Sequence, residues 1–85
     1  MQKYKIFFAP TAAKQLAKFS PEIRTRLLNA ISKLSTSPFL GKRLKGDLGD
    51  YYSYRVGNYR VVYLVRQREI QVEIVRVAHR KEVYK

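Results

Sequence analysis

The stretch RVGNYR, residues 55–60, places two arginines on either side of a tight turn signal. Gly57 and Asn58 are typical of a two-residue hairpin loop, and the runs on both sides are rich in strand-forming residues. In such a hairpin Arg55 lies directly opposite Arg60, with the two Cβ atoms about 5 Å apart. Two like charges at that spacing predict an anion bound between or above them. The alternative is that both long side chains simply extend into water.

Tyrosines crowd the same segment. Five of the seven in the chain lie there, at Tyr51, Tyr52, Tyr54, Tyr59 and Tyr63. Aromatic rings stack on bases and guanidinium groups bind phosphates through paired hydrogen bonds, so the combination favours RNA as the anion. Tyrosine is also a good strand former. We therefore expect some of the five rings to fill the core and only one or two to contact a ligand.

A second basic cluster closes the chain, where Arg76, His79, Arg80 and Lys81 precede Tyr84. If the last strands form a meander, this tail returns to the sheet that carries the opposed arginines. A concave surface lined by those arginines, Arg80 and a tyrosine would then be an anion site. His79 is the only histidine, the residue type that titrates nearest neutrality. A lone histidine is more often structural than catalytic, and both roles stay open.

Other chemistries lack the residues that they need. The chain has no cysteine, which excludes disulfides and thiolate metal sites. Its six acidic residues form no cluster spaced for a metal, and neither a Ser/His/Asp set nor a glycine-rich phosphate loop is convincing. We expect no metal and no cofactor.

The charge balance points to the class of partner. Eighteen Lys and Arg stand against six Asp and Glu, a net charge of +12, which favours nucleic acid or an acidic protein partner. The opening MQKYKIFFAP contains an apolar run that is too short for a signal peptide or a membrane span. We expect a cytoplasmic protein that does not contact a membrane.

The elements that must position these residues follow from the spacing of apolar side chains. Residues 3–9 alternate as a first strand, which Pro10 ends. A short helix, capped by Thr11, is expected to run to about residue 19. A second helix begins with the cap Ser20 and with Pro21 at its first position, and keeps an apolar stripe to about residue 35.

A loop rich in Gly, Ser and Pro follows over residues 36–50, and Lys42, Arg43 and Lys45 make it basic. Three strands are then expected, at about 51–56, 59–66 and 70–77. The last strand changes the phase of its alternation at Val75, which predicts a bulge or burial on both faces.

The order of these elements predicts the architecture. Strand, helix, helix and three strands indicate one α+β domain over residues 1–85. The three strands form an antiparallel meander, and the helix hairpin packs on one face of the sheet.

Nearly the whole chain resembles the RelE toxins of the RelE/ParE superfamily, above all RLKGDLGDYYSYRVGNYRVVYLV and the ending VAHRKEVYK. These proteins are the toxin halves of toxin–antitoxin pairs. The resemblance implies a ribosome-dependent endoribonuclease that cuts mRNA in the A site without a metal. It also implies an acidic antitoxin, encoded alongside, that binds the monomeric toxin.

Carried over by position, the resemblance assigns roles to four residues. Arg60 would bind the RNA phosphate, and Arg55 would act as the general base or stabilise the negative charge. Arg80 would stabilise the transition state or assist the leaving oxygen, and Tyr84 would stack on the base or orient the hydroxyl. The further residues expected to contact RNA are Lys42, Arg43, Lys45, Ser53, His79 and Lys81.

One departure from the family affects the general base. Relatives often carry a basic residue two positions before Arg55, where this chain has Ser53. Arginine is a poor proton carrier at neutral pH, so the general base stays open, with His79 as a candidate.

Two other functions also stay open. ParE-type toxins share the fold but poison DNA gyrase, and a non-enzymatic RNA- or ribosome-binding module would suit the charge. The ending HRKEVY favours the RNA-cleaving branch.

Overall fold

The computed structural model describes residues 3–44 and 51–79. Its element order confirms the α+β class, with two helices between a first strand and a run of three long strands. In chain order the elements are β1 (Lys5–Phe8), α1 (Pro10–Ala17), α2 (Pro21–Ser32), the 3₁₀ helix η1 (Lys33–Ser35), β2 (Lys42–Arg43), β3 (Tyr51–Val56), β4 (Tyr59–Arg66) and β5 (Gln71–His79).

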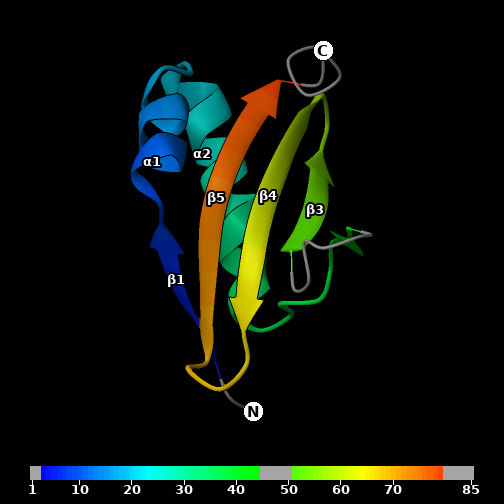
Figure 1. Cartoon of the computed structure of the whole chain (residues 1–85). Helices are drawn as coiled ribbons and strands as arrows, with labels where there is room; N and C mark the ends of the chain where they lie inside the picture. Colours follow the sequence, from blue (N-terminus) through cyan, green and yellow to red (C-terminus); the bar gives the residue numbers. More distant parts are fainter. Residues whose placement is uncertain (1–2, 45–50, 80–85) are drawn as a thin grey trace.

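The sheet has five strands in the order β1-β5-β4-β3-β2 (Figure 1). Its centre is the expected antiparallel meander of β3, β4 and β5. The first strand joins it in parallel with β5, because the helix pair carries the chain back along the sheet before the meander begins. The two-residue β2 extends the opposite edge, within the segment that the sequence predicted to be a loop.

The two helices begin differently. α2 starts as predicted: Ser20 is its N-cap, the Ser20 hydroxyl accepts a hydrogen bond from the Ile23 N–H at 3.4 Å, and Pro21 follows. The prediction that Thr11 caps the first helix was wrong. α1 begins two residues earlier than this cap implied, at Pro10, with Ala9 as an N-cap that makes no side-chain hydrogen bond. Proline suits the first helical position because its fixed φ is helical and its missing N–H would have no helical partner there.

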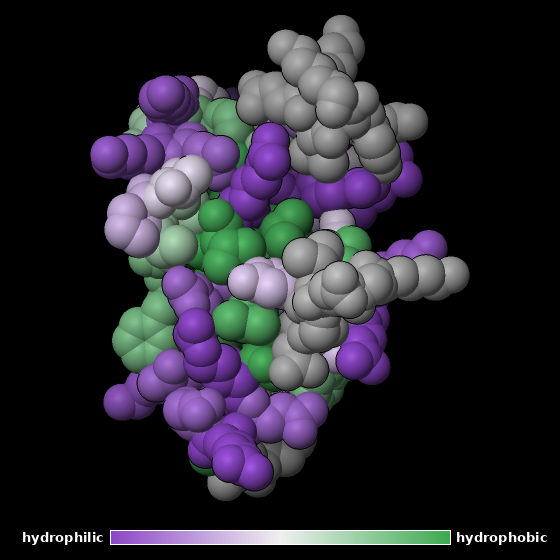
Figure 2. All heavy atoms as spheres, in the orientation of Figure 1, coloured by the Kyte–Doolittle hydropathy of each residue, from purple (hydrophilic) through white to green (hydrophobic). Residues whose placement is uncertain are grey.

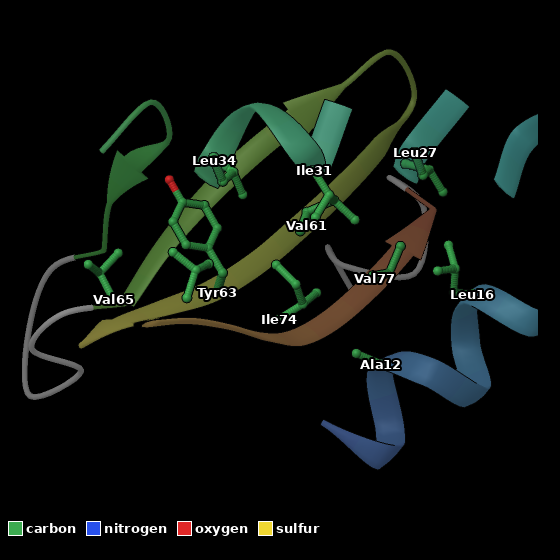
Figure 3. Close-up of a cluster of buried hydrophobic side chains, with 11 residues drawn as sticks. Ala12, Leu16, Leu27, Ile31, Leu34, Val61, Tyr63, Val65, Ile74 and Val77 are labelled. Carbon is green, nitrogen blue, oxygen red and sulfur yellow. The ribbon is translucent and has the colours of Figure 1, made fainter. Parts of the chain in front are cut away.

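Both helices cover one face of the sheet, and the core fills the space between them (Figures 1 and 3). The predicted apolar stripe of α2 is confirmed, since Leu27, Ile31 and the following Leu34 are fully buried. The rest of the buried cluster comes from α1 and the central strands: Ala12, Leu16, Val61, Tyr63, Val65, Val72, Ile74 and Val77. Among the described residues, no helix is long and apolar enough to span a membrane.

The predicted irregularity of the last strand is a bulge. Val62 pairs with Arg76 but the next residue, Tyr63, pairs with Ile74, so Val75 is an additional residue of β5. The bulge lets Ile74 and Val77 both face the helices, although they are three positions apart. It also turns Arg76 toward the face of the sheet that the helices do not cover. The bulge therefore decides which face of β5 carries this positive charge.

Candidate functional site

The opposed arginines are confirmed by the strand register. Arg55 pairs with Arg60 and Val56 with Tyr59, so the loop consists of Gly57 and Asn58. Gly57 has a φ of 59°, a conformation that glycine adopts without steric cost. The hairpin therefore holds the two guanidinium groups on neighbouring strands, on the same face of the sheet.

That face is the one without helices, named here the open face. On β3 and β4 the alternate residues Tyr52, Tyr54, Val61 and Tyr63 pack into the core, so their sequence neighbours point the other way. The cross-strand pairs then assign the following polar residues to the open face: Lys42, Ser53, Arg55, Arg60 and Arg76.

Figures 1 and 2 look onto the open face, with the helices behind the sheet. Its middle is hydrophobic, and hydrophilic side chains gather toward both ends (Figure 2). The arginine pair lies at the end next to the β3–β4 turn. At the other end Arg66 forms an ion pair with Glu73, with Nη1 and Oε1 2.6 Å apart. Glu73 is thus already paired, and its partner in the strand register, Leu64, lies four residues along β4 from Arg60, roughly 13 Å away.

Most of the five clustered tyrosines are structural. Tyr52 stacks on Tyr63, with ring centroids 5.6 Å apart, and Tyr59 packs edge-on against Phe19 at 5.1 Å. Tyr54 also packs against the core. Tyr51 pairs with Leu64 and so belongs to the open face. This confirms that some of the rings fill the core, and leaves Tyr51 as the ring of the five placed to meet a ligand there.

His79 lies on the other face from the arginines. It pairs with Tyr59, and the two rings meet edge-on with centroids 5.1 Å apart. Strand alternation causes this, because the residue of β5 opposite Arg60 is Ala78. The structure therefore does not bring His79 to Arg55 and Arg60, and its placement favours the structural role over that of a base.

The basic loop is divided between the two faces. Lys42 pairs with Ser53 and shares the open face, whereas Arg43 pairs with Tyr52 and points to the other side. Both side chains are exposed. The predicted site residues Lys45, Arg80, Lys81 and Tyr84 lie outside the described residues.

Comparison with known proteins decides the family. The protein-family model described as the ParE toxin of type II toxin–antitoxin systems, parDE, matches residues 6–84 of this chain. The Mycobacterium tuberculosis toxin RelG is 34% identical over 84 residues, covering 96% of this chain and 97% of that protein. The chain belongs to the RelE/ParE family of type II toxins.

Solved structures of the family share the fold of this toxin. The M. tuberculosis RelBE2 toxin–antitoxin complex matches with a TM-score of 0.83 and 35% identity, covering 92% of this chain and 99% of that chain. The isolated Escherichia coli RelE toxin matches with a TM-score of 0.80 and 29% identity, covering 95% of this chain and 90% of that chain. Within the described part of the toxin, no group of three or more His, Cys, Asp or Glu side chains is arranged to hold a metal.

One contact of the toxin has no simple sequence signal. The fully buried Tyr63 hydroxyl accepts a hydrogen bond at 2.9 Å from the backbone N–H of Gly41, the residue just before β2. A Cβ added at Gly41 would lie 2.8 Å from that hydroxyl and 2.8 Å from the Ser53 carbonyl oxygen. Tyr63 thereby anchors the start of β2 against β3. A glycine in a glycine-rich segment and a tyrosine in a strand look ordinary in sequence, so sequence reasoning missed both.

The burial of Tyr63 at this contact predicts that the fold loses stability at alkaline pH. Burial raises the pKa of Tyr63 above its ordinary value of 10.0, and the charges of Tyr52 and Tyr54 add to this, although the Gly41 hydrogen bond opposes it. Above about pH 10 the unfolded chain loses this proton first, so stability falls as pH rises through the folded-state pKa.

We expect Tyr63→Phe to lose less thermal stability than the wild type between about pH 9 and about pH 11. At neutral pH the same change should cost about 1 kcal/mol, from the lost hydrogen bond. Circular-dichroism melts of both proteins across this pH range measure the difference. Parallel pH curves would show that Tyr63 ionises as easily in the folded state as in the unfolded state.

Proposed function

We propose that this RelE/ParE-family toxin is a ribosome-dependent endoribonuclease that cleaves mRNA in the A site and so blocks translation. The observation that carries the proposal is the register pair of Arg55 and Arg60 on the open face, with Arg76 on the adjoining strand. Two guanidinium groups held side by side suit a phosphate, because each offers a planar fork of N–H donors. The relatives named RelE and RelG support the same branch.

The proposed chemistry needs no metal. The RNA 2′-hydroxyl attacks the adjacent phosphorus, the bond to the 5′-oxygen breaks, and the products are a 2′,3′-cyclic phosphate and a 5′-hydroxyl. The proton of the attacking hydroxyl must leave, and the departing oxygen must gain one. Arg60 and Arg55 would stabilise the extra negative charge on the phosphate oxygens as it develops.

Two residues outside the described part of the chain complete the proposal. Arg80 would assist the departing oxygen, and Tyr84 would stack on the base or orient the hydroxyl. With His79 turned to the other face, catalysis rests mainly on charge stabilisation. The substrate places the proposed activity in the cytoplasm, at the ribosome.

The proposal includes an antitoxin. The solved relatives include toxin–antitoxin complexes, among them the M. tuberculosis RelBE2 complex and the RelB–RelE complex of Methanococcus jannaschii. A chain with a net charge of +12 suits an acidic partner. Apolar side chains on the edge strand and the helix pair, Phe7 at 45% and Leu28 at 40% exposed, are candidates for that contact.

A second function has one observation in its favour. The matching family model carries the ParE name, and the activity that the resemblance implies for the ParE branch is inhibition of DNA gyrase. The named relatives are RelE-type, so we place RNA cleavage first.

Primer extension on a defined mRNA tests the choice. Purified toxin is added to a bacterial translation extract, and in parallel to the same mRNA without ribosomes. We expect cuts within translated codons that disappear when ribosomes are omitted. Intact mRNA in an actively translating extract would reject RNA cleavage, and gyrase-linked DNA breaks would then support the ParE-type activity.

A further inference from the structure

Lys42 is the residue that the short strand β2 brings to the arginine pair. It pairs with Ser53, and Ser53 lies two residues before Arg55 on the same face of β3. Directly opposed Cβ atoms are about 5 Å apart, and residues two apart on a strand about 7 Å. The flexible four-carbon stem of lysine allows its ammonium group to reach the space beside Arg55.

We propose that Lys42 supplies a further cation of the RNA site, binding the RNA backbone together with Arg55 and Arg60. This inference rests on the proposed function, and it names the residue that binds RNA on the β2 side of the same site. Ser53, which occupies the neighbouring position on β3, carries no charge and has a short side chain. At this position of the open face, the positive charge therefore comes from Lys42 on β2, because Ser53 on β3 carries none.

The surrounding contacts hold β2 in register. Before Lys42, the Gly41 N–H donates to the buried Tyr63 hydroxyl at 2.9 Å. After Arg43, the Leu44 N–H donates to the Tyr51 carbonyl oxygen at 3.0 Å. The absence of a side chain at Gly41 allows the close approach to the Ser53 backbone. A two-residue edge strand with an anchor on each side presents its lysine at a defined position, as a ligand-binding group requires.

The edge of the sheet farthest from β2 offers a matched control. Lys5 on β1 pairs with Gln71 and, like Lys42, is an exposed lysine on the open face. The two lysines occupy opposite edge strands, four strand spacings or about 19 Å apart. Lys5→Met thus removes the same charge from the same face, away from the arginine pair.

The test measures single-turnover cleavage of ribosome-bound mRNA by Lys42→Met, Lys42→Arg and Lys5→Met. We expect Lys42→Met to slow cleavage about tenfold, the loss typical of one hydrogen bond to a charged group. Lys42→Arg and Lys5→Met should stay within about threefold of wild type. All three should melt like the wild type, because each position is exposed.

A charge exchange across the strand pair separates a charge effect from a structural one. Lys42→Ser removes the ammonium group, and adding Ser53→Lys returns it to the facing position, about 5 Å away. We expect the double variant to recover most of the activity that Lys42→Ser loses. A merely structural role for Lys42 would not be rescued in this way.

The outcomes distinguish this inference from the proposed function. Wild-type cleavage together with an unimpaired Lys42→Met protein would overturn the role of Lys42 and leave the nuclease intact. A double variant no faster than Lys42→Ser would overturn it equally. A wild-type protein that does not cleave ribosome-bound mRNA would reject the nuclease itself, and with it this assignment.

Discussion

Arg60→Ala is expected to abolish mRNA cleavage and growth inhibition while leaving the domain folded. The side chain lies on the open face, between Arg55 on β3 and the small Ala78 on β5. Removing one preorganised donor aimed at a developing negative charge costs about 10²–10³ in rate. Arg60→Lys keeps the charge but loses the planar fork, so an intermediate rate is expected. Primer extension and growth curves after induced expression measure both effects.

Arg68→Ala is the matched control for this experiment. Arg68 is exposed in the turn between β4 and β5, at the opposite end of β4 from the arginine pair. The change removes one positive charge from the protein, as Arg60→Ala does, but away from the site. Equal loss of cleavage in both variants would indicate a general effect of charge. A folded Arg60→Ala protein that cleaves like the wild type would refute the proposed role of Arg60.

Leu27→Ala should have the largest effect on stability. Leu27 lies on α2, is 0% exposed, and packs in the cluster between the helices and the sheet (Figure 3). Truncating a buried leucine to alanine costs about 2–5 kcal/mol, because it removes buried apolar surface and leaves a cavity. For a domain of this size each kcal/mol lowers the melting temperature by roughly 4–8 °C. We therefore expect a fall of roughly 10 °C or more in a circular-dichroism melt.

The next residue along the helix provides the control. Leu28 is 40% exposed, so Leu28→Ala removes the same atoms from a surface that water already reaches. We expect it to change the free energy of unfolding by less than about 1 kcal/mol. If the two variants melted at the same temperature, the assignment of the inner face of α2 would be wrong.

The sequence alone determined the parts that depend on local patterns. The register of the β3–β4 hairpin followed from a two-residue loop, because a hairpin of known loop length has no freedom in its pairing. The start of α2 followed from its serine cap and proline, and the bulge in β5 from a break in alternation. These features involve neighbouring residues, so the sequence carries their signal directly.

Only the tertiary structure decided which distant segments meet. The parallel pairing of β1 with β5 and the contact of Gly41 with Tyr63 join residues that are 22 or more positions apart in the chain. The added edge strand β2 pairs with residues 9 to 11 positions further along. No local spacing encodes such contacts, since they follow from how the helix pair packs on the sheet.

The composition of the site shows the same division. Basic and aromatic residue types, visible in the sequence, predicted an anion surface, and the Gly57-Asn58 loop predicted the pairing of Arg55 with Arg60. Which side chains share the face was decided by pairing along the whole sheet, which brings Lys42 to the open face and places His79 on the other. A shift of one residue in a strand exchanges its two faces, so a site on a sheet is defined only when every strand is in register.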